Sequence, residues 1–437
     1  MRIVTIGDVG VVDDMIHIGD EAMFDEFAAQ LRARGASITG VSSSPAETAA
    51  RYGIDAVPTL DFSPATTGGR DGQRERRRRV LAAADGDRSA LPDSDRAWRV
   101  IDAVRAADAV AVAGGGNMAS LWPMHVYERA TLGALARRAR KPYVVTGQTI
   151  GPVLEGEDRD LVAELLSGAE LVGLREGASF ELVRGLGVPE SLLTATIDDA
   201  SFVGLGSGPS SGSGSRPDTG SSSSSGSDFG TSSGSGPDSG SADAAPLPYC
   251  AVSLSAHVGD ADRGRFAEAV ARVLDRIVDE TGLQIVFLAH WASLRPGDER
   301  GDSLLHRDVI EQMTRPARVE PTTDTPAAAR LARGAALHLT SRYHPAVFAV
   351  AGGVPTVGIA VDDYTTVKLT GALGNFGQSS VVSSAELLDG SAAAVALEAW
   401  AARADVHRAW EARVGSARTA SAAWWDRVAS ALGALHP

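Results

Sequence analysis

Three ionisable side chains, Arg342, His344 and Lys368, gather around one short pattern in the second half of the sequence. Residues 336–360 read as a strand, a small apolar helix and a second strand, which is the repeating unit of a parallel sheet. Ligands of open parallel sheets bind at the carboxyl ends of the strands, beside the N-termini of helices. The three side chains therefore lie where an anionic ligand would bind.

The chain as a whole is strongly acidic, which makes a local group of cationic or ionisable side chains unusual. The sequence carries a formal charge of −14, so a local cluster of cationic groups calls for a local reason. Arg175 follows another apolar run, residues 171–174, and is also expected at the carboxyl end of a strand. Gly115 and Gly116 follow the expected strand 107–113, and glycines there allow the backbone to approach a ligand or a neighbouring strand closely.

The elements that must position these residues alternate between strands and helices in two parts of the chain. A segment of Ser, Gly, Asp and Pro with almost nothing apolar separates the parts, and it cannot bury enough surface to offset its chain entropy. The sequence thus predicts an α/β protein with two Rossmann-like domains and a disordered insertion between them. The predicted units are residues 1–205 (first domain), 206–248 (linker), 249–384 (second domain) and 385–437 (C-terminal helices that pack back toward the first domain).

Bulk properties narrow the function classes. Hydrophobic residues make up 44% of the chain, as in soluble globular proteins. The acidic balance argues against nucleic acid as a partner. The single cysteine, Cys250, has no second cysteine with which to form an intramolecular disulfide, and this favours a reducing, cytoplasmic compartment. No His-Glu-x-x-His or similar spacing suggests a metal site.

Residues 74–79 contain five arginines and one glutamate. Two interpretations remain open for this run. The first is a solvated helix face or loop, and the second is a docking site for an anionic, lipid-linked substrate.

A set of short motifs carries a family resemblance. In chain order they are Gly19-Asp20-Glu21-Ala22, Gly114-Gly115-Gly116, Gly147-Gln148-Thr149-Ile150-Gly151-Pro152, Leu174-Arg175-Glu176 with Ser179, Asp199-Ala200-Ser201-Phe202, Ser341-Arg342-Tyr343-His344 and Gly353-Val354-Pro355. In this order the sequence resembles the polysaccharide pyruvyl transferase family. The resemblance implies two Rossmann-like domains facing a cleft, as in GT-B glycosyltransferases. It also implies transfer of pyruvyl from phosphoenolpyruvate to a sugar of a cell-surface polymer or cell-wall precursor, usually as a ketal.

The resemblance suggests roles for the site residues, each with a structural alternative. Arg175 and Arg342 would bind the carboxylate and phosphate of phosphoenolpyruvate, because guanidinium groups offer planar, multidentate donors, or they would form structural ion pairs. His344 would protonate the methylene carbon as a general acid, would hydrogen-bond the phosphate as an imidazolium, or would be a buried structural histidine. Lys368 would bind phosphate as a point charge or be a solvated helix lysine. Asp20 would contact acceptor hydroxyls or stabilise a helix N-terminus.

Three functions remain open on the sequence alone. The first is pyruvyl transfer to a glycan or lipid-linked sugar, with no cofactor besides the donor substrate and with peripheral membrane contact only through the acceptor. The second is glycosyl transfer from a nucleotide sugar on the same fold. The third is glycan binding without catalysis. Substrate contacts are expected at Arg175, Arg342, Lys368, Asp20, Gly115 and Gly116, and catalysis at His344.

Overall fold

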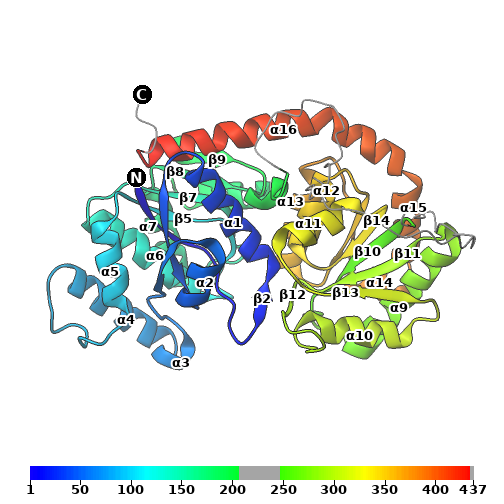
Figure 1. The fold of residues 1–437 in the computed structure, drawn as a ribbon, viewed down its shortest axis with the longest axis horizontal. Helices are drawn as coiled ribbons and strands as arrows, with labels where there is room; N and C mark the ends of the chain where they lie inside the picture. Colours follow the sequence, from blue (N-terminus) through cyan, green and yellow to red (C-terminus); the bar gives the residue numbers. More distant parts are fainter. Residues whose placement is uncertain (206–246, 434–437) are drawn as a thin grey trace, which may run out of the picture.

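The computed structural model describes residues 1–205 and 247–433, which form two α/β domains with a long C-terminal helix lying across both (Figure 1). The predicted linker, residues 206–248, falls outside the described residues apart from Leu247 and Pro248. The described residues contain no helix that is both long and apolar enough to cross a membrane.

The first domain is built on an eight-stranded sheet whose strand pairs are all parallel. Its register places Ile3 beside Ile38 on one side and beside Ala109 on the other. The strands are short apolar runs, as expected of parallel strands that are covered on both faces. Across the sheet they are β4 (Asp55–Pro58), β3 (Ser37–Ser42), β1 (Arg2–Ile6), β5 (Ala109–Val112), β7 (Tyr143–Ile150), β8 (Leu171–Leu174) and β9 (Leu193–Ala195), and β6 (Gly115–Met118) also pairs with β7.

Helices cover both faces of this sheet. Alternate residues of β1 divide between two cores, with Val4 and Ile6 in one and Ile3 in the other. Helices α4 to α7 supply the first core, and α1 together with the end of the C-terminal helix supplies the second. The helices are α1 (Ile18–Arg32), α2 (Pro45–Tyr52), α3 (Pro64–Thr67), α4 (Arg70–Ala84), α5 (Ala97–Ala106), α6 (Pro123–Arg138), α7 (Gly156–Ser167) and α8 (Gly177–Gly185), with 3-10 turns at Glu190–Leu192 (η1) and Asp199–Phe202 (η2).

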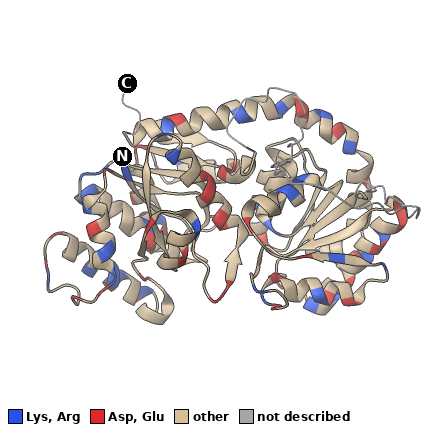
Figure 2. Ribbon diagram, in the orientation of Figure 1, with Lys and Arg blue, Asp and Glu red and all other residues tan. Residues whose placement is uncertain are grey.

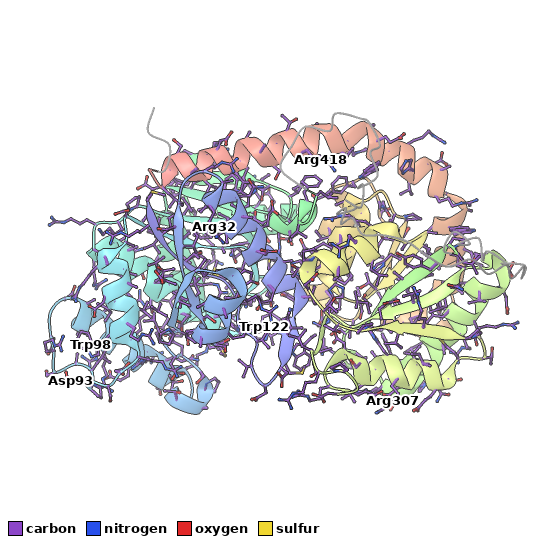
Figure 3. The ribbon with its side chains drawn as sticks, viewed as in Figure 1. Arg32, Asp93, Trp98, Trp122, Arg307 and Arg418 are labelled. Atoms are coloured by element: carbon purple, nitrogen blue, oxygen red, sulfur yellow. The ribbon has the colours of Figure 1, made fainter. Side chains whose placement is uncertain are left out.

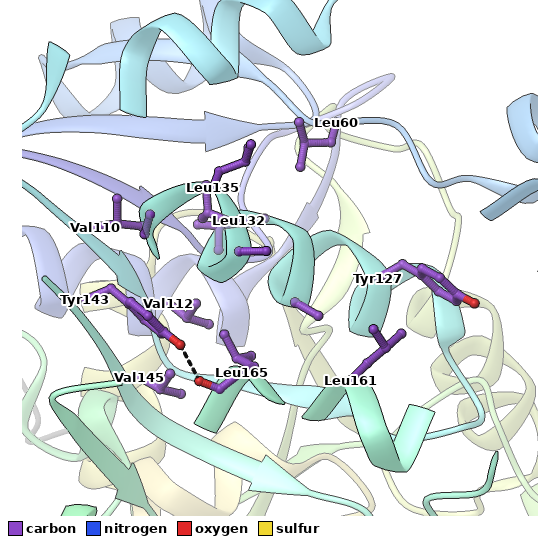
Figure 4. Packing of buried hydrophobic residues seen from close by; sticks show 14 of the residues in the cluster. Leu60, Val110, Val112, Tyr127, Leu132, Leu135, Tyr143, Val145, Leu161 and Leu165 are labelled. Carbon is purple, nitrogen blue, oxygen red and sulfur yellow. Dashed lines mark hydrogen bonds between the residues drawn. The ribbon is translucent and has the colours of Figure 1, made fainter. Parts of the chain in front are cut away.

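Figure 4 shows the larger of these two cores, where α6 and α7 pack on the sheet. Leu132 and Leu165 meet valines of the central strands there. The Tyr143 hydroxyl of β7 lies in this packing, and its hydrogen-bonding capacity is satisfied because it donates to the Leu165 carbonyl at 2.6 Å. The packing fixes α6 against the sheet.

The second domain repeats the plan with six parallel strands. Across the sheet they are β13 (Ala317–Glu320), β11 (Gln284–Leu288), β10 (Tyr249–Ser253), β14 (Leu337–Thr340), β15 (Thr356–Ala360) and β16 (Val381–Ser383). One face carries α9 (Arg263–Thr281), α10 (Asp302–Gln312), α14 (Ser384–Asp389) and α15 (Ala392–Ala401). The other carries α11 (Thr325–Gly334), α12 (Tyr343–Ala351) and α13 (Asp363–Gly374). The two-domain α/β fold predicted from the sequence is confirmed.

In both sheets the direction in which the chain adds strands reverses at the centre. The reversal lies between β1 and β5 in the first domain and between β10 and β14 in the second. Such switch points leave a crevice at the carboxyl ends of the strands, and ligands of doubly wound folds bind there. The fold thus supplies one crevice in each domain.

A short sheet is one of the connections between the domains. A two-stranded antiparallel sheet pairs β2 (Met15–His17) of the first domain with β12 (Trp291–Ser293) of the second, and the Ile18 amide donates to the His290 carbonyl at 2.9 Å. Neither three-residue strand was predicted, because so short a run carries no periodic signal. The four-residue strands β4 and β6 were not predicted either.

The last helix, α16 (Arg403–Ala431), is another connection and spans both domains in Figure 1. Near its start the Trp410 indole donates to the Ala351 carbonyl of the second domain at 2.8 Å. Near its end Trp424 and Trp425 are buried in the first domain, where Trp425 packs edge-on against Phe27 at 5.9 Å. The helix therefore carries large aromatic side chains into each domain.

The arginine-rich run lies on α4, and Figure 2 shows blue (Lys, Arg) segments of the ribbon in this region. Each of its five arginines has a partner within the first domain. The partners are Glu157 for Arg74, Asp95 for Arg76, Glu164 for Arg77, Glu75 for Arg78 and the Ala90 carbonyl for Arg79. These contacts favour the first interpretation, a helix face whose charges are balanced locally.

We expect Trp425→Ala to lower the free energy of unfolding by about 3–5 kcal/mol, because it opens a cavity between α16 and α1. The measurement is urea unfolding followed by fluorescence and circular dichroism. Glu411→Ala, an exposed position on the same helix, serves as the control and should change stability by less than about 0.5 kcal/mol. Equal stability of Trp425→Ala and wild type would show that α16 does not hold the first domain.

Candidate functional site

A cavity of about 540 Å³ lies between the two domains, at the carboxyl ends of both sheets. The second domain lines it with residues that follow β10, β11, β14 and β15. The first domain lines it with the start of α1, the end of β6 and the start of α6. The two crevices provided by the fold therefore open into one shared site.

Arg342 lines the cavity as the residue immediately before α12. No side chain caps this helix, so its first backbone N–H groups have no side-chain acceptor. These groups and the positive end of the helix dipole lie at the N-terminus, beside Arg342. One edge of the Arg342 guanidinium forms a two-fold ion pair with buried Asp302, in which Nε lies 2.8 Å from Oδ2. Its remaining Nη1 lies 3.4 Å from Nε2 of His17. Asp302 thus holds the guanidinium in one orientation and leaves Nη1 beside the cavity.

His344 lies on the first turn of α12 and is buried against the first turn of α1. The fit is so close that a Cβ atom at Gly19 would lie 1.9 Å from the His344 Nδ1. The Nε2 atom is 3.8 Å from Asp198 Oδ2 and has no hydrogen-bond partner among the described residues. Burial lowers the pKa of His344 well below its ordinary value; the charge of Arg175 adds to this effect, and Asp20 opposes it. The imidazole is therefore neutral at neutral pH in the empty site.

Lys368 reaches the cavity from α13, and its ammonium lies over two aromatic rings, 4.8 Å from the centre of Tyr343 and 4.7 Å from that of Tyr364. Its Nζ donates to the Tyr364 hydroxyl at 3.0 Å. Burial, reinforced by the charge of Arg175, lowers the pKa of Lys368 to about 8. This lysine is not the solvated helix residue of the alternative interpretation.

Arg175 does not line the cavity. Its guanidinium is fully buried and is engaged by Asp198 at 2.6 Å, by Glu176 at 3.1 Å and by Thr149 Oγ1 at 2.8 Å, while it stacks on the Tyr343 ring at 4.3 Å. Arg175 thus forms the structural ion pair that was the alternative to a ligand contact. Its Nη2 atom has no partner among the described residues and lies directly behind Gly116.

The two predicted glycines differ in position. A Cβ atom at Gly116 would lie 2.6 Å from Lys368 Nζ, so this residue allows the two domains to approach within the cavity, and its carbonyl accepts a hydrogen bond from Tyr364. Gly115 is not part of the cavity lining and faces Gln148 instead. A Cβ atom built on Gly115 would lie 3.2 Å from the Gln148 Oε1. Gly115 therefore serves strand packing.

Asp20 lines the cavity beside His17, with its Oδ2 3.0 Å from His17 Nδ1. Burial by itself raises the pKa of Asp20, but the neighbouring His17 brings it below the ordinary value. The carboxylate is therefore ionised in the empty site, as either of its predicted roles requires.

Several lining residues were not predicted from the sequence. They are His17, Asn117, Trp122, His125, Ser255, His257 and Asp362. Trp122 lies near the boundary between the domains in Figure 3. Most of these residues follow a strand or begin a helix, so their position in the strand–helix alternation was the sequence signal that could have identified them as lining residues. Within the described ranges, no group of three or more His, Cys, Asp or Glu side chains is arranged to hold a metal ion.

Comparison with known proteins identifies the family of this chain. The family model of polysaccharide pyruvyl transferases matches residues 17–363, well over half of the sequence. A comparison with curated proteins finds no match.

Solved structures of other proteins share the fold. A putative UDP-N-acetylglucosamine 2-epimerase from Listeria monocytogenes has a TM-score of 0.57 and 11% identity over 99% of this chain and 95% of that one. The calicheamicin glycosyltransferase CalG4 has a TM-score of 0.51 and 16% identity over 100% of this chain and 99% of that one. Alr3699/HepE from Anabaena in complex with UDP has a TM-score of 0.51 and 12% identity over 100% of both chains. These similarities confirm the GT-B architecture.

Lys368 offers a direct test of the electrostatics of the cavity, because the chain contains only two lysines, Lys141 and Lys368. After reductive ¹³C-methylation, the NMR signal that disappears in Lys368→Arg should titrate with a midpoint near pH 8. Lys141→Arg identifies the second signal. A midpoint for Lys368 near 10.4, the usual value for lysine, would contradict the buried environment described above.

Proposed function

The chain belongs to the polysaccharide pyruvyl transferase family, and we propose that it transfers pyruvyl from phosphoenolpyruvate to a sugar of a polysaccharide or glycolipid precursor. The observation that carries the proposal is the convergence of Arg342, Lys368, His344 and the N-terminus of α12 on one wall of a single interdomain cavity. These groups suit a small ligand with a carboxylate and a phosphate. The other wall is free for an acceptor.

The cationic wall can hold the two charged groups of the donor. A guanidinium and a helix N-terminus both supply directed N–H donors to an oxyanion, and such charge-assisted hydrogen bonds are the strong ones. Lys368 adds a point charge that is desolvated by its burial, so its attraction to phosphate is weakly screened. Arg175 lies behind Gly116 with its Nη2 unpartnered among the described residues, while Asp198 and Glu176 pair with the rest of its guanidinium.

The chemistry needs one proton donor and two acceptor hydroxyls. Protonation of the methylene carbon makes the adjacent C2 electrophilic, and a sugar hydroxyl then forms an O–C2 bond. The C2–O bond to phosphate breaks and its electron pair leaves with the phosphate, after which a second hydroxyl attacks C2 and closes the ketal. Of the two hydroxyl protons released, one replaces the proton given to the methylene carbon and the other leaves with the phosphate.

His344 is the proposed proton donor. It is neutral in the empty site, because burial and Arg175 lower its pKa well below the ordinary value. A bound phosphoenolpyruvate would place several negative charges beside the ring and so raise this pKa. The donor would thus bring about the protonation that its own reaction requires, and protonation would be confined to the loaded site.

A nucleotide sugar is the alternative donor, and one observation favours it, since Alr3699/HepE, a structure of this architecture, is in complex with UDP. The small cationic wall argues for phosphoenolpyruvate instead. Binding measurements with phosphoenolpyruvate, UDP and UDP-sugars separate the two donors, because a specific ligand stabilises the folded state.

Phosphoenolpyruvate should bind the wild type more weakly as the pH rises through about 8, by up to about tenfold per pH unit, because Lys368 then loses its charge. Lys368→Met should weaken binding about 10- to 100-fold at pH 7 and flatten the profile above pH 8. Calorimetric titration measures both effects, with Lys141→Met as the matched control. Stabilisation by UDP in place of phosphoenolpyruvate would refute the proposed donor.

His344→Asn should lower turnover by about 10²–10⁴-fold while phosphoenolpyruvate binding changes little, because a proton donor acts in the transition state. The assay is phosphate release from phosphoenolpyruvate in the presence of p-nitrophenyl hexosides. Calorimetry in buffers of different ionisation enthalpy should also show proton uptake on donor binding by the wild type and less uptake by the variant. Turnover of His344→Asn at the wild-type rate would remove this residue from the mechanism.

A further inference from the structure

The first-domain wall of the cavity differs chemically from the cationic wall. Its lining residues Asn117, Trp122 and His125 come from the end of β6 and the start of α6. Behind them lies Asp8, which follows β1 at the switch point of the sheet. None of these four residues has a role in donor binding as proposed above.

Asp8 and His125 form a carboxylate–imidazole pair with a fixed geometry. Asp8 Oδ1 lies 3.3 Å from His125 Nδ1, while its Oδ2 accepts hydrogen bonds from Arg129 at 2.7 Å and from the amide of Asn117. Burial raises the pKa of Asp8, but Arg129 and His125 lower it more, and the resulting pKa lies well below its ordinary value. An ionised carboxylate at this distance favours the tautomer that carries its proton on Nδ1.

The consequence is an available base on Nε2. In that tautomer Nε2 is the acceptor atom of the ring, and no described residue donates to it; the ring's other contact is Arg129 Nη1, 3.4 Å from Nδ1. The side chain of His125 is 28% exposed and lines the cavity, so a ligand can reach it. A carboxylate-oriented histidine of this kind is the usual means of taking a proton from a hydroxyl.

Trp122 provides an apolar surface next to this base. Its ring meets Tyr364 edge-on at 5.0 Å, and the neighbouring Leu121 is 65% exposed at the rim. A half-buried indole beside polar groups suits a sugar ring, whose C–H face is apolar and whose edge carries hydroxyls. Asp8 is paired with Arg129 behind this wall, so the wall carries little net charge and suits a neutral ligand.

We propose that this wall is the acceptor subsite, that Trp122 stacks on a neutral hexose ring, and that His125, oriented by Asp8, takes the proton from the attacking hydroxyl. The inference rests on the proposed pyruvyl transfer and names residues for its second substrate. As the acceptor oxygen forms its bond to C2 of the donor, the O–H bond breaks and the proton moves to His125 Nε2. The proton then passes to the departing phosphate, which carries the electron pair of the broken C2–O bond.

Variants at two residues, Trp122 and His125, separate stacking from proton transfer, with p-nitrophenyl glucoside, galactoside, mannoside and N-acetylglucosaminide as acceptor probes. Trp122→Ala should raise KM for the glycoside at least about tenfold, and Trp122→Phe should restore part of the loss. His125→Asn should lower kcat about 10²-fold or more with KM nearly unchanged. In each variant the calorimetric Kd for phosphoenolpyruvate should stay within about threefold of wild type.

Matched controls lie elsewhere in the chain. His407→Asn removes a histidine that also lies beside a carboxylate, Glu411 at 3.5 Å, but on the exposed face of α16. Trp400→Ala removes a half-buried tryptophan of α15. Both controls should retain wild-type KM and kcat, and melting curves establish that all variants are folded.

Each other outcome contradicts a stated part of the inference. Unchanged kcat in His125→Asn removes the base, and unchanged KM in Trp122→Ala removes the stacking surface. A loss of phosphoenolpyruvate affinity above about tenfold in either variant would assign this wall to the donor. If the wild type binds phosphoenolpyruvate but shows no saturation-transfer NMR signal and no turnover with any of the four glycosides, the neutral-hexose subsite is wrong. If it binds the glycosides through Trp122 but not phosphoenolpyruvate, the proposed donor fails and the subsite stands.

Discussion

The buried guanidinium of Arg175 is the constraint around which the junction of the two domains is built. A charge removed from water is tolerated only when it is paired and hydrogen-bonded, and Asp198 and Glu176 supply that pairing from the segments that follow β9 and β8. On its open face the guanidinium stacks on Tyr343, which begins α12 of the second domain. One ion group therefore fixes the end of the first domain against the helix that carries His344.

The same buried charge governs the electrostatics of the site. Arg175 lies close enough to lower the pKa of both His344 and Lys368, in each case after burial itself. The cavity consequently holds its histidine neutral and its lysine only partly charged at slightly alkaline pH. An anion that entered this wall would restore both charges, because it offsets the repulsion and replaces the lost hydration. Binding and protonation are linked by this arrangement.

Close approach of the backbones is the second condition that the site imposes. A Cβ atom at Gly19 would overlap the His344 ring, and one at Gly116 would lie 2.6 Å from the ammonium of Lys368. Glycine at these two positions lets the first domain present main chain, rather than side chains, to the cationic wall. The short β2–β12 sheet and α16 then hold the domains at this separation.

The sequence by itself determined the two α/β domains and the cationic wall, because strand–helix–strand alternation is local and puts Arg342, His344 and Lys368 at one sheet edge. Only the tertiary structure showed that Arg175 forms a buried ion pair with Asp198 and stacks on Tyr343, since both partners come from distant segments of the chain. It alone brought Asp8 beside His125, two residues far apart in the chain that meet because α6 packs on the sheet next to β1. Local pattern sets which residues end a strand, whereas long-range packing decides which of those ends face each other and which charges remain free.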